Sequence, residues 1–128
     1  MKNVVVKNSN IDGNGVFANR DFLKGEVVIK WDVSHKLTKD EVDKLPKKEK
    51  IYIAFLDGEY ILMQSPARYV NHSCNANTYS NNFCDIAKRD IKKGEEITGD
   101  YSENEIPGFS MKCNCKAKNC RRIISSKN

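Results

Sequence analysis

The sequence predicts a mostly β protein built from short strands, with few and short helices. Apolar and polar residues alternate with a period of two, and turn-forming residues recur at short spacing along the 128 residues. A chain of this length forms one domain and buries roughly two-thirds of the surface that its unfolded form exposes. We therefore expect many short strands around one core rather than a helical bundle.

Four segments are the clearest strand candidates. Val4-Val5-Val6 is β-branched, and residues 26–31 form a largely apolar run. Residues 51–56 and 59–63 flank Asp57-Gly58, a dipeptide that readily adopts the positive φ angles of a two-residue type I′ turn. This last pair of segments predicts a β-hairpin.

One short helix is predicted near residue 40. Thr38 followed by Glu41 has the form of a capping box, and Leu45-Pro46 supplies a stop signal. The helix between these signals would be about two turns long.

The chain also contains a repeated segment. Residues 18–26 and 87–95 share the pattern Ala-x-Arg-Asp-x-x-Lys-Gly-Glu. In each copy a glycine stands between a lysine and a glutamate that precedes an apolar run, which is typical of a turn leading into a strand. Two copies do not make a repeat protein, so we interpret the pattern as one kind of turn used twice.

Composition indicates a soluble, intracellular protein from a reducing compartment, either cytoplasm or nucleus. The five cysteines are an odd number, and the chain starts without the apolar stretch of a secretory signal. It contains no run of eighteen apolar residues, so we expect no membrane span. The formal net charge of +5 is mild and scattered, which favours solubility over a nucleic-acid partner.

Three separated segments carry residues suited to chemistry. They are Asn71-His72-Ser73-Cys74, Asp100-Tyr101, and Cys113-Asn114-Cys115 with Cys120 after it. The close spacing of the last three cysteines suits a metal better than disulfides. Structural zinc is almost always tetrahedral with cysteine or histidine ligands, so these cysteines need a fourth partner.

Taken in order, the motifs resemble those of the SET-domain protein-lysine methyltransferases with a post-SET zinc tail. They are Gly13-Asn14-Gly15 with Val16-Phe17-Ala18, residues 68–77, residues 94–101, and Cys-x-Cys-x4-Cys, and the match runs from about residue 11 to residue 122. The resemblance implies a fold of short β-sheets in which the segment Asn71–Cys74 and the Tyr101 segment meet in a pseudoknot. It implies a SET domain over residues 1–102, with a short insert at about 32–64, and a zinc-binding tail over residues 103–128.

The same resemblance implies a protein-lysine N-methyltransferase that uses S-adenosylmethionine. Its partner would be a protein with an exposed lysine, and histone tails are the best-known targets of the family. Deprotonating a lysine at pH 7 costs roughly 4.6 kcal/mol, whereas aligning two reactants supplies about 7–11 kcal/mol. Positioning is therefore the larger effect, and no dedicated strong base is required.

Residue roles follow from the resemblance. Tyr101 matches the active-site tyrosine, whose hydroxyl lies beside the reacting methyl and amine. The matches to cofactor-binding residues are Gly13, Asn14, Gly15, Arg68, Asn71 and His72; those to the lysine channel are Tyr52, Gly99 and Tyr101; those to the zinc ligands are Cys74, Cys113, Cys115 and Cys120. For Arg68, bracing of the pseudoknot and a surface salt bridge are alternatives. Tyr60, Tyr69 and Phe109 are further channel candidates, although such aromatics are more often core, and His35 and Cys84 are interpreted as structural.

The chain departs from the family pattern at three places. Ala76 replaces a proline that is usual after the Asn-His-Ser-Cys motif. Gly99 stands where relatives commonly carry a Phe or Tyr that limits the number of methyl groups, so we expect a wider channel and di- or trimethylated product. The insert between Trp31 and Gln64 is too short for the recognition elements of larger relatives, so we expect lower specificity, or specificity supplied by a homodimer or a partner.

Two other functions fit the sequence. The first is a non-catalytic, zinc-stabilised SET-type module whose channel recognises lysine-bearing tails; the joint presence of Tyr101, Asn71 and His72 favours the enzyme. The second is nucleic-acid contact through the basic residues between Lys112 and Arg122, although loops around metal sites are commonly basic. Nucleic acid is not required by the leading interpretation.

Overall fold

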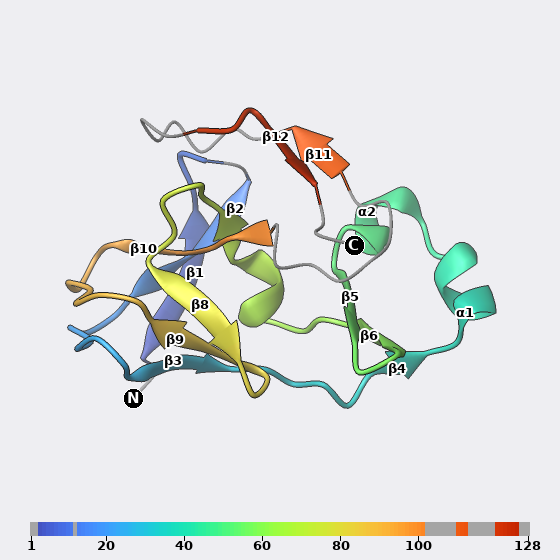
Figure 1. Ribbon diagram of the computed structural model, residues 1–128, viewed down its shortest axis with the longest axis horizontal. Helices are drawn as coiled ribbons and strands as arrows, with labels where there is room; N and C mark the ends of the chain where they lie inside the picture. Colours follow the sequence, from blue (N-terminus) through green and yellow to red (C-terminus); the bar gives the residue numbers. More distant parts are fainter. Residues whose placement is uncertain (1–2, 12, 102–109, 113–119, 126–128) are drawn as a thin grey trace.

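The computed structural model confirms the mostly β class and shows small sheets joined by short connections (Figure 1). It describes residues 3–11, 13–101, 110–112 and 120–125. The strands in these ranges are β1 (Val4–Asn8), β2 (Asn14–Ala18), β3 (Val27–Lys30), β4 (Lys36–Leu37), β5 (Ile53–Leu56), β6 (Glu59–Leu62), β7 (Asn71–His72), β8 (Thr78–Asn81), β9 (Cys84–Ala87), β10 (Glu96–Gly99), β11 (Ser110–Lys112) and β12 (Ile123–Ser125). The helices are α1 (Lys39–Asp43), α2 (Lys47–Lys50) and the 3-10 helix η1 (Ala67–Tyr69). All of these helices are too short to cross a bilayer.

Strand β10 joins the N-terminal hairpin to the middle of the chain. The largest sheet in the described part of the chain has the order β1-β2-β10-β7. Strand β2 pairs antiparallel with both β1 and β10, whereas β7 pairs parallel with β10, with Thr98 opposite Asn71 and Gly99 opposite His72. The two segments that the family resemblance brings together therefore do meet.

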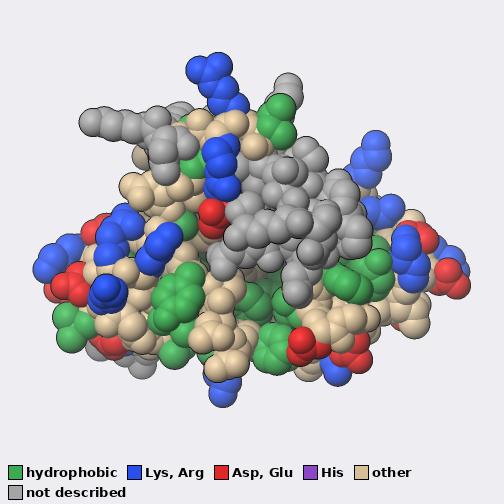
Figure 2. All heavy atoms as spheres, in the orientation of Figure 1, with side chains coloured by type: hydrophobic (Ala, Val, Ile, Leu, Met, Phe, Trp, Pro, Cys, Tyr) green, Lys and Arg blue, Asp and Glu red, His purple; other side chains and the backbone are tan. Residues whose placement is uncertain are grey.

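The insert forms a body of its own at one side of the molecule, made of β4, α1, α2, β5 and β6 (Figure 1). The predicted hairpin is confirmed, because Leu56 pairs with Glu59 and both Asp57 and Gly58 have positive φ angles, 50° and 78°. Lysines and acidic residues are interspersed on this side of the surface (Figure 2).

The predicted helix is confirmed together with its cap. The Glu41 backbone N–H donates to Thr38 Oγ1 at 3.2 Å, and the Thr38 backbone N–H donates to Glu41 Oε1 at 3.0 Å. The helix covers five residues, so it is shorter than the two turns predicted. A second short helix, α2, follows Pro46 and was not predicted, because its sequence Lys-Lys-Glu-Lys has no apolar residue to reveal a helical period.

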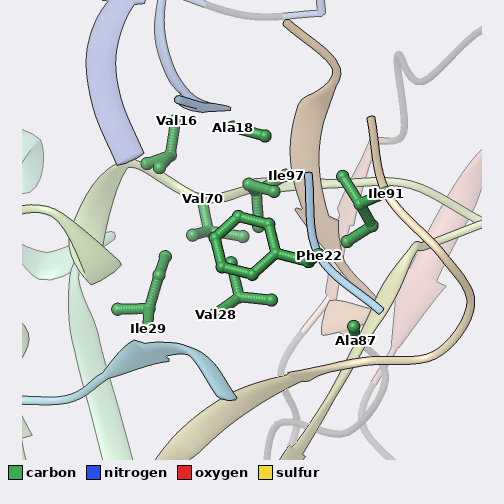
Figure 3. Close-up of a cluster of buried hydrophobic side chains, with 9 residues drawn as sticks. All are labelled: Val16, Ala18, Phe22, Val28, Ile29, Val70, Ala87, Ile91 and Ile97. Carbon is green, nitrogen blue, oxygen red and sulfur yellow. The ribbon is translucent and has the colours of Figure 1, made fainter. Parts of the chain in front are cut away.

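The two copies of the repeated segment pair with each other over the core. Phe22 and Ile91, both fully buried, exchange backbone hydrogen bonds of 2.8 Å in each direction. Their side chains point into one apolar cluster (Figure 3), which contains Val16, Ala18, Phe22, Val28, Ile29, Val70, Ala87, Ile91 and Ile97. The repeat thus places one buried apolar residue from each turn at the centre of the fold.

Side chains reinforce the pairing between the two repeated segments. Asp21 accepts a hydrogen bond from the backbone N–H of Lys93, and Asp90 accepts one from the backbone N–H of Lys24, both at 2.8 Å. Each turn therefore caps the other, which explains why both copies carry the same aspartate.

Candidate active site

Tyr101 is held at the end of β10 by two contacts to the β7 segment. Its backbone N–H donates to Nδ1 of His72 at 2.9 Å, and the two rings lie with their centroids 5.4 Å apart. Its hydroxyl donates to the backbone carbonyl oxygen of Val70. Both ends of the tyrosine are therefore tied to the segment that precedes Cys74.

His72 is a buried, neutral imidazole. Because Nδ1 accepts the hydrogen bond from Tyr101, the ring proton lies on Nε2, which is 3.4 Å from Cys74 Sγ. Burial lowers the pKa of His72, and the nearby Asp100 carboxylate opposes this shift. The 3.8 Å approach between Nδ1 and Asp100 is consequently not an ion pair.

A carboxylate connects Asn71 to the N-terminal loop. Glu96 accepts hydrogen bonds from Ser9 Oγ at 2.8 Å and from Asn71 Nδ2 at 3.0 Å. The same Asn71 amide donates to the backbone carbonyl oxygen of Asn14 at 3.1 Å. Gly15 lies against this carboxylate, so a Cβ there would collide with Glu96 Oε2 and lie 2.9 Å from Ser9 Cβ. The structure thus brings three of the predicted cofactor-binding residues together.

Arg68 faces the insert. Its Nη2 pairs with Oε2 of Glu49 on α2 at 2.5 Å, and its Cζ lies 4.0 Å from the centroid of the Tyr52 ring. Tyr52 in turn contacts Tyr69 edge-on, with centroids 5.8 Å apart. The predicted cofactor contact of Arg68 stays a prediction. Arg68 does form a salt bridge, but this pair is part-buried, unlike the surface salt bridge considered as an alternative.

The remaining channel candidates occupy different places. Gly99 ends β10, and a Cβ added there would meet only Val70 Cγ1, at an ordinary 3.7 Å. Tyr60 packs on Phe55 within the insert hairpin, with centroids 4.9 Å apart, as expected of a structural aromatic. Phe109 lies outside the described residues. Gly13, a candidate for cofactor binding, has a φ angle of 43° just before β2.

The C-terminal tail reaches Cys74 through Arg121. The backbone N–H and Nε–H of Arg121 donate to Cys74 Sγ at 3.2 and 3.4 Å, and its Nη2 pairs with Asp100 at 2.8 Å. These contacts to sulfur and carboxylate raise the pKa of Arg121 above its ordinary value, so the guanidinium stays charged. One arginine therefore ties the tail both to the candidate zinc ligand and to the residue before Tyr101.

Two of the four predicted zinc ligands can be described. Cys120 Sγ accepts a hydrogen bond from the Arg122 backbone N–H at 3.4 Å, while Cys113 and Cys115 lie outside the described residues. Among the residues that are described, no group of three or more metal-binding side chains gathers. The donor chemistry of four thiols, with N–H groups directed at Cys74 and Cys120, fits a structural zinc ion.

Sequence reasoning did not assign roles to several residues of this region. Glu96 lies within the motif at residues 94–101 and Arg121 follows Cys120 directly, so their positions in or beside the motifs were an available signal. Ser9 and Glu49 gave no signal, because their partners Glu96 and Arg68 lie 87 and 19 residues away.

The packing around Gly15 predicts a specific loss of stability. Gly15→Ala should lower the free energy of unfolding by about 1–3 kcal/mol, because the added Cβ overpacks against Glu96 and Ser9. Gly99→Ala is the matched control, and it should be neutral or stabilising by about 0.4–1 kcal/mol because its Cβ has room. Urea denaturation followed by circular dichroism measures both; equal losses would contradict the prediction.

The family to which the chain belongs follows from comparisons with known proteins. A family model described as "SET domain" matches residues 13–102. The "Histone-lysine N-methyltransferase, H3 lysine-36 specific" of Candida glabrata is 31% identical over 98% of this chain and 20% of its own length. The "Histone-lysine N-methyltransferase trr" of Drosophila melanogaster is 32% identical over 96% of this chain and 6% of its own length. The "Histone-lysine N-methyltransferase 2D" of Homo sapiens is 31% identical over 96% of this chain and 2% of its own length. The chain thus spans a fifth or less of these relatives, and it belongs to the SET-domain family.

Proposed function

We propose that this SET domain transfers a methyl group from S-adenosylmethionine to the side-chain amine of a protein lysine. The observation that carries the proposal is the convergence of Tyr101, Asn71 and His72 where β7 pairs with β10. The loop Asn14-Gly15 lies beside Asn71 through the shared Glu96 carboxylate. Relatives over nearly the whole chain are named as histone-lysine N-methyltransferases, which supports the same reaction.

Each residue has a defined task in this proposal. S-adenosylmethionine, when bound, supplies a methyl group on a positively charged sulfur. Gly13, Asn14, Gly15, Asn71 and His72 hold the cofactor, with Glu96 fixing the Asn71 amide. Tyr101 orients the reacting amine through its hydroxyl, which the Val70 carbonyl keeps in place. Alignment of this kind supplies more free energy than deprotonating the lysine requires.

A histone tail is the first substrate class to test, because the relatives are named for histone lysines. The proposed zinc ligands are Cys74, Cys113, Cys115 and Cys120, and such thiolates require a reducing compartment. The nucleic-acid interpretation of the tail gains no support from Arg121, whose guanidinium is engaged by Cys74 and Asp100. A homodimer or partner that supplies specificity stays a prediction of the sequence.

Calorimetric titration with S-adenosylmethionine and with its demethylated product tests the proposal. The zinc-loaded wild type should bind both saturably. Asn71→Ala should weaken binding about tenfold or more, because it removes an amide that joins two sides of the site. His35→Ala is the control and should bind like the wild type, since His35 lies on the exposed insert.

Tyr101→Phe separates binding from chemistry. It should retain cofactor affinity and slow methyl transfer to a histone H3 tail peptide by about a hundredfold, the scale of losing one oriented polar group in a transition state. A folded, zinc-loaded wild type that binds neither compound would favour the non-catalytic, lysine-recognising module instead.

The number of methyl groups transferred depends on the space at Gly99. The wild type should give di- or trimethyl-lysine, whereas Gly99→Tyr should stop at monomethyl-lysine, because the new ring extends from a Cβ that fits against Val70. A mass-spectrometric time course on one lysine peptide measures this. Exclusive monomethylation by the wild type would exclude the wider channel.

Zinc should be bound at about one ion per chain, measured by plasma mass spectrometry. Cys74→Ser and Cys120→Ser should lose the metal, and chelation of the wild type should lower its thermal midpoint, because zinc binding contributes directly to folding. Cys84→Ser is the matched control and should keep the metal, since Cys84 pairs within β9 opposite Lys30 and Asn81. Metal loss from Cys84→Ser alone would contradict the proposed ligand set.

A further inference from the structure

We propose that Arg68 is a positioning residue of the lysine channel, which holds the Tyr52 ring in place while Glu49 of the insert holds Arg68. The inference rests on the proposed methyltransferase function and on the matching of Tyr52 to the channel wall. It gives Arg68 a task on the substrate side of the site, distinct from the cofactor contact predicted from the sequence.

The guanidinium of Arg68 is fixed by contacts of two kinds. Glu49 Oε2 binds Nη2 at 2.5 Å, and the side chain of Arg68 is only 17% exposed. The Tyr52 ring lies 4.0 Å from Cζ, and the Tyr69 ring lies 5.7 Å away. A planar guanidinium makes a carboxylate pair and a ring stack at the same time, which a lysine ammonium does not.

A buried donor on the same side chain points to a specific role. Arg68 Nε is buried and has no hydrogen-bond partner among the described residues. An unpaired buried donor is costly, so its presence calls for an explanation. The geometry offers an explanation: the guanidinium plane is oriented to contact the Tyr52 ring and the Glu49 carboxylate, and this orientation leaves Nε without a hydrogen bond.

Arg68 also connects the insert to the catalytic segment. The Tyr52 backbone N–H donates to the Glu49 carbonyl oxygen at 3.0 Å, which joins Tyr52 to Glu49 at the end of α2. Arg68 and Tyr69 belong to η1, and the next residue, Val70, supplies the carbonyl that binds the Tyr101 hydroxyl. The Arg68 contacts therefore set the position of the insert aromatic relative to the active-site tyrosine.

Steady-state kinetics on a lysine-bearing histone H3 tail peptide tests the inference. Arg68→Ala should raise KM for the peptide about tenfold, and Glu49→Gln by about threefold, as expected for loss of a partly buried charge pair and ring contact. Arg68→Lys should lie between Arg68→Ala and the wild type, because it keeps a charge for Glu49 and loses the stack. Lys48→Gln, which removes an exposed charge from the same helix, is the matched control and should behave like the wild type.

Cofactor affinity and amide exchange separate this role from other roles. Calorimetric affinity for S-adenosylmethionine should stay within about twofold of the wild type in Arg68→Ala and Glu49→Gln, because neither variant alters the Asn71 side of the site. Hydrogen exchange should accelerate in residues 47–55 and not in β2, where the core is unaffected.

Three results would overturn the inference. Cofactor affinity that falls in step with the KM effect would place Arg68 in the cofactor site. Uniform acceleration of exchange would show general destabilisation, and an unchanged peptide KM in both Arg68→Ala and Glu49→Gln would remove the role altogether. A wild type that binds no cofactor and methylates no peptide would overturn the proposed function, while the exchange data would still decide whether Arg68 and Glu49 fix Tyr52.

Discussion

The parallel pairing of β7 with β10 is the interaction on which the candidate site depends. It consists of two residue pairs, and parallel pairing is slightly less stable per residue than antiparallel pairing. Asn77, 3% exposed, reinforces it from the side: its Nδ2 donates to the Glu96 carbonyl oxygen at 2.8 Å, and its Oδ1 accepts from the Thr98 backbone N–H at 2.9 Å. The buried Asn77 side chain therefore fixes β10 by binding two backbone groups of the strand that would otherwise lack hydrogen-bond partners.

The position of β10 explains why residues far apart in sequence meet at Tyr101. One edge of the strand pairs with β2, which brings the glycine loop alongside, and its other edge pairs with β7, which brings Asn71 and His72. Ile97 of β10 is fully buried in the apolar core together with Phe22 and Ile91, whereas Tyr101, just past the end of the strand, is partly exposed. The strand thus connects the buried core to a partly exposed side chain.

Local features were predictable from the sequence because their causes are local. The Asp57-Gly58 turn and the Thr38–Glu41 capping box each act within four residues, and both are present. The repeated segment was recognised, but its mutual pairing through Phe22 and Ile91 was not, because a sequence pattern does not show which face meets which.

The candidate site could be predicted only as far as its motifs extend. The order of the motifs predicted that Tyr101, Asn71, His72 and Cys74 are site residues, and these residues do lie together. The contacts of side chains outside the motifs could not be predicted. The partners of Ser9 and Glu49 are set by tertiary packing and not by spacing along the chain. Cys113 and Cys115, on which the zinc prediction also depends, lie outside the described residues.

Three contacts of charged side chains lie near the pairing of β7 with β10, and each involves a different part of the chain. Glu96 binds Asn71 beside the N-terminal loop, Arg68 binds Glu49 of the insert, and Arg121 of the tail binds Asp100. Exposed ion pairs contribute little to stability, whereas pairs that are partly buried and hydrogen-bonded fix geometry. Under the proposed function, methyl transfer needs alignment more than it needs a strong base, so the part-buried Glu96–Asn71 and Arg68–Glu49 contacts would contribute by fixing the positions of side chains.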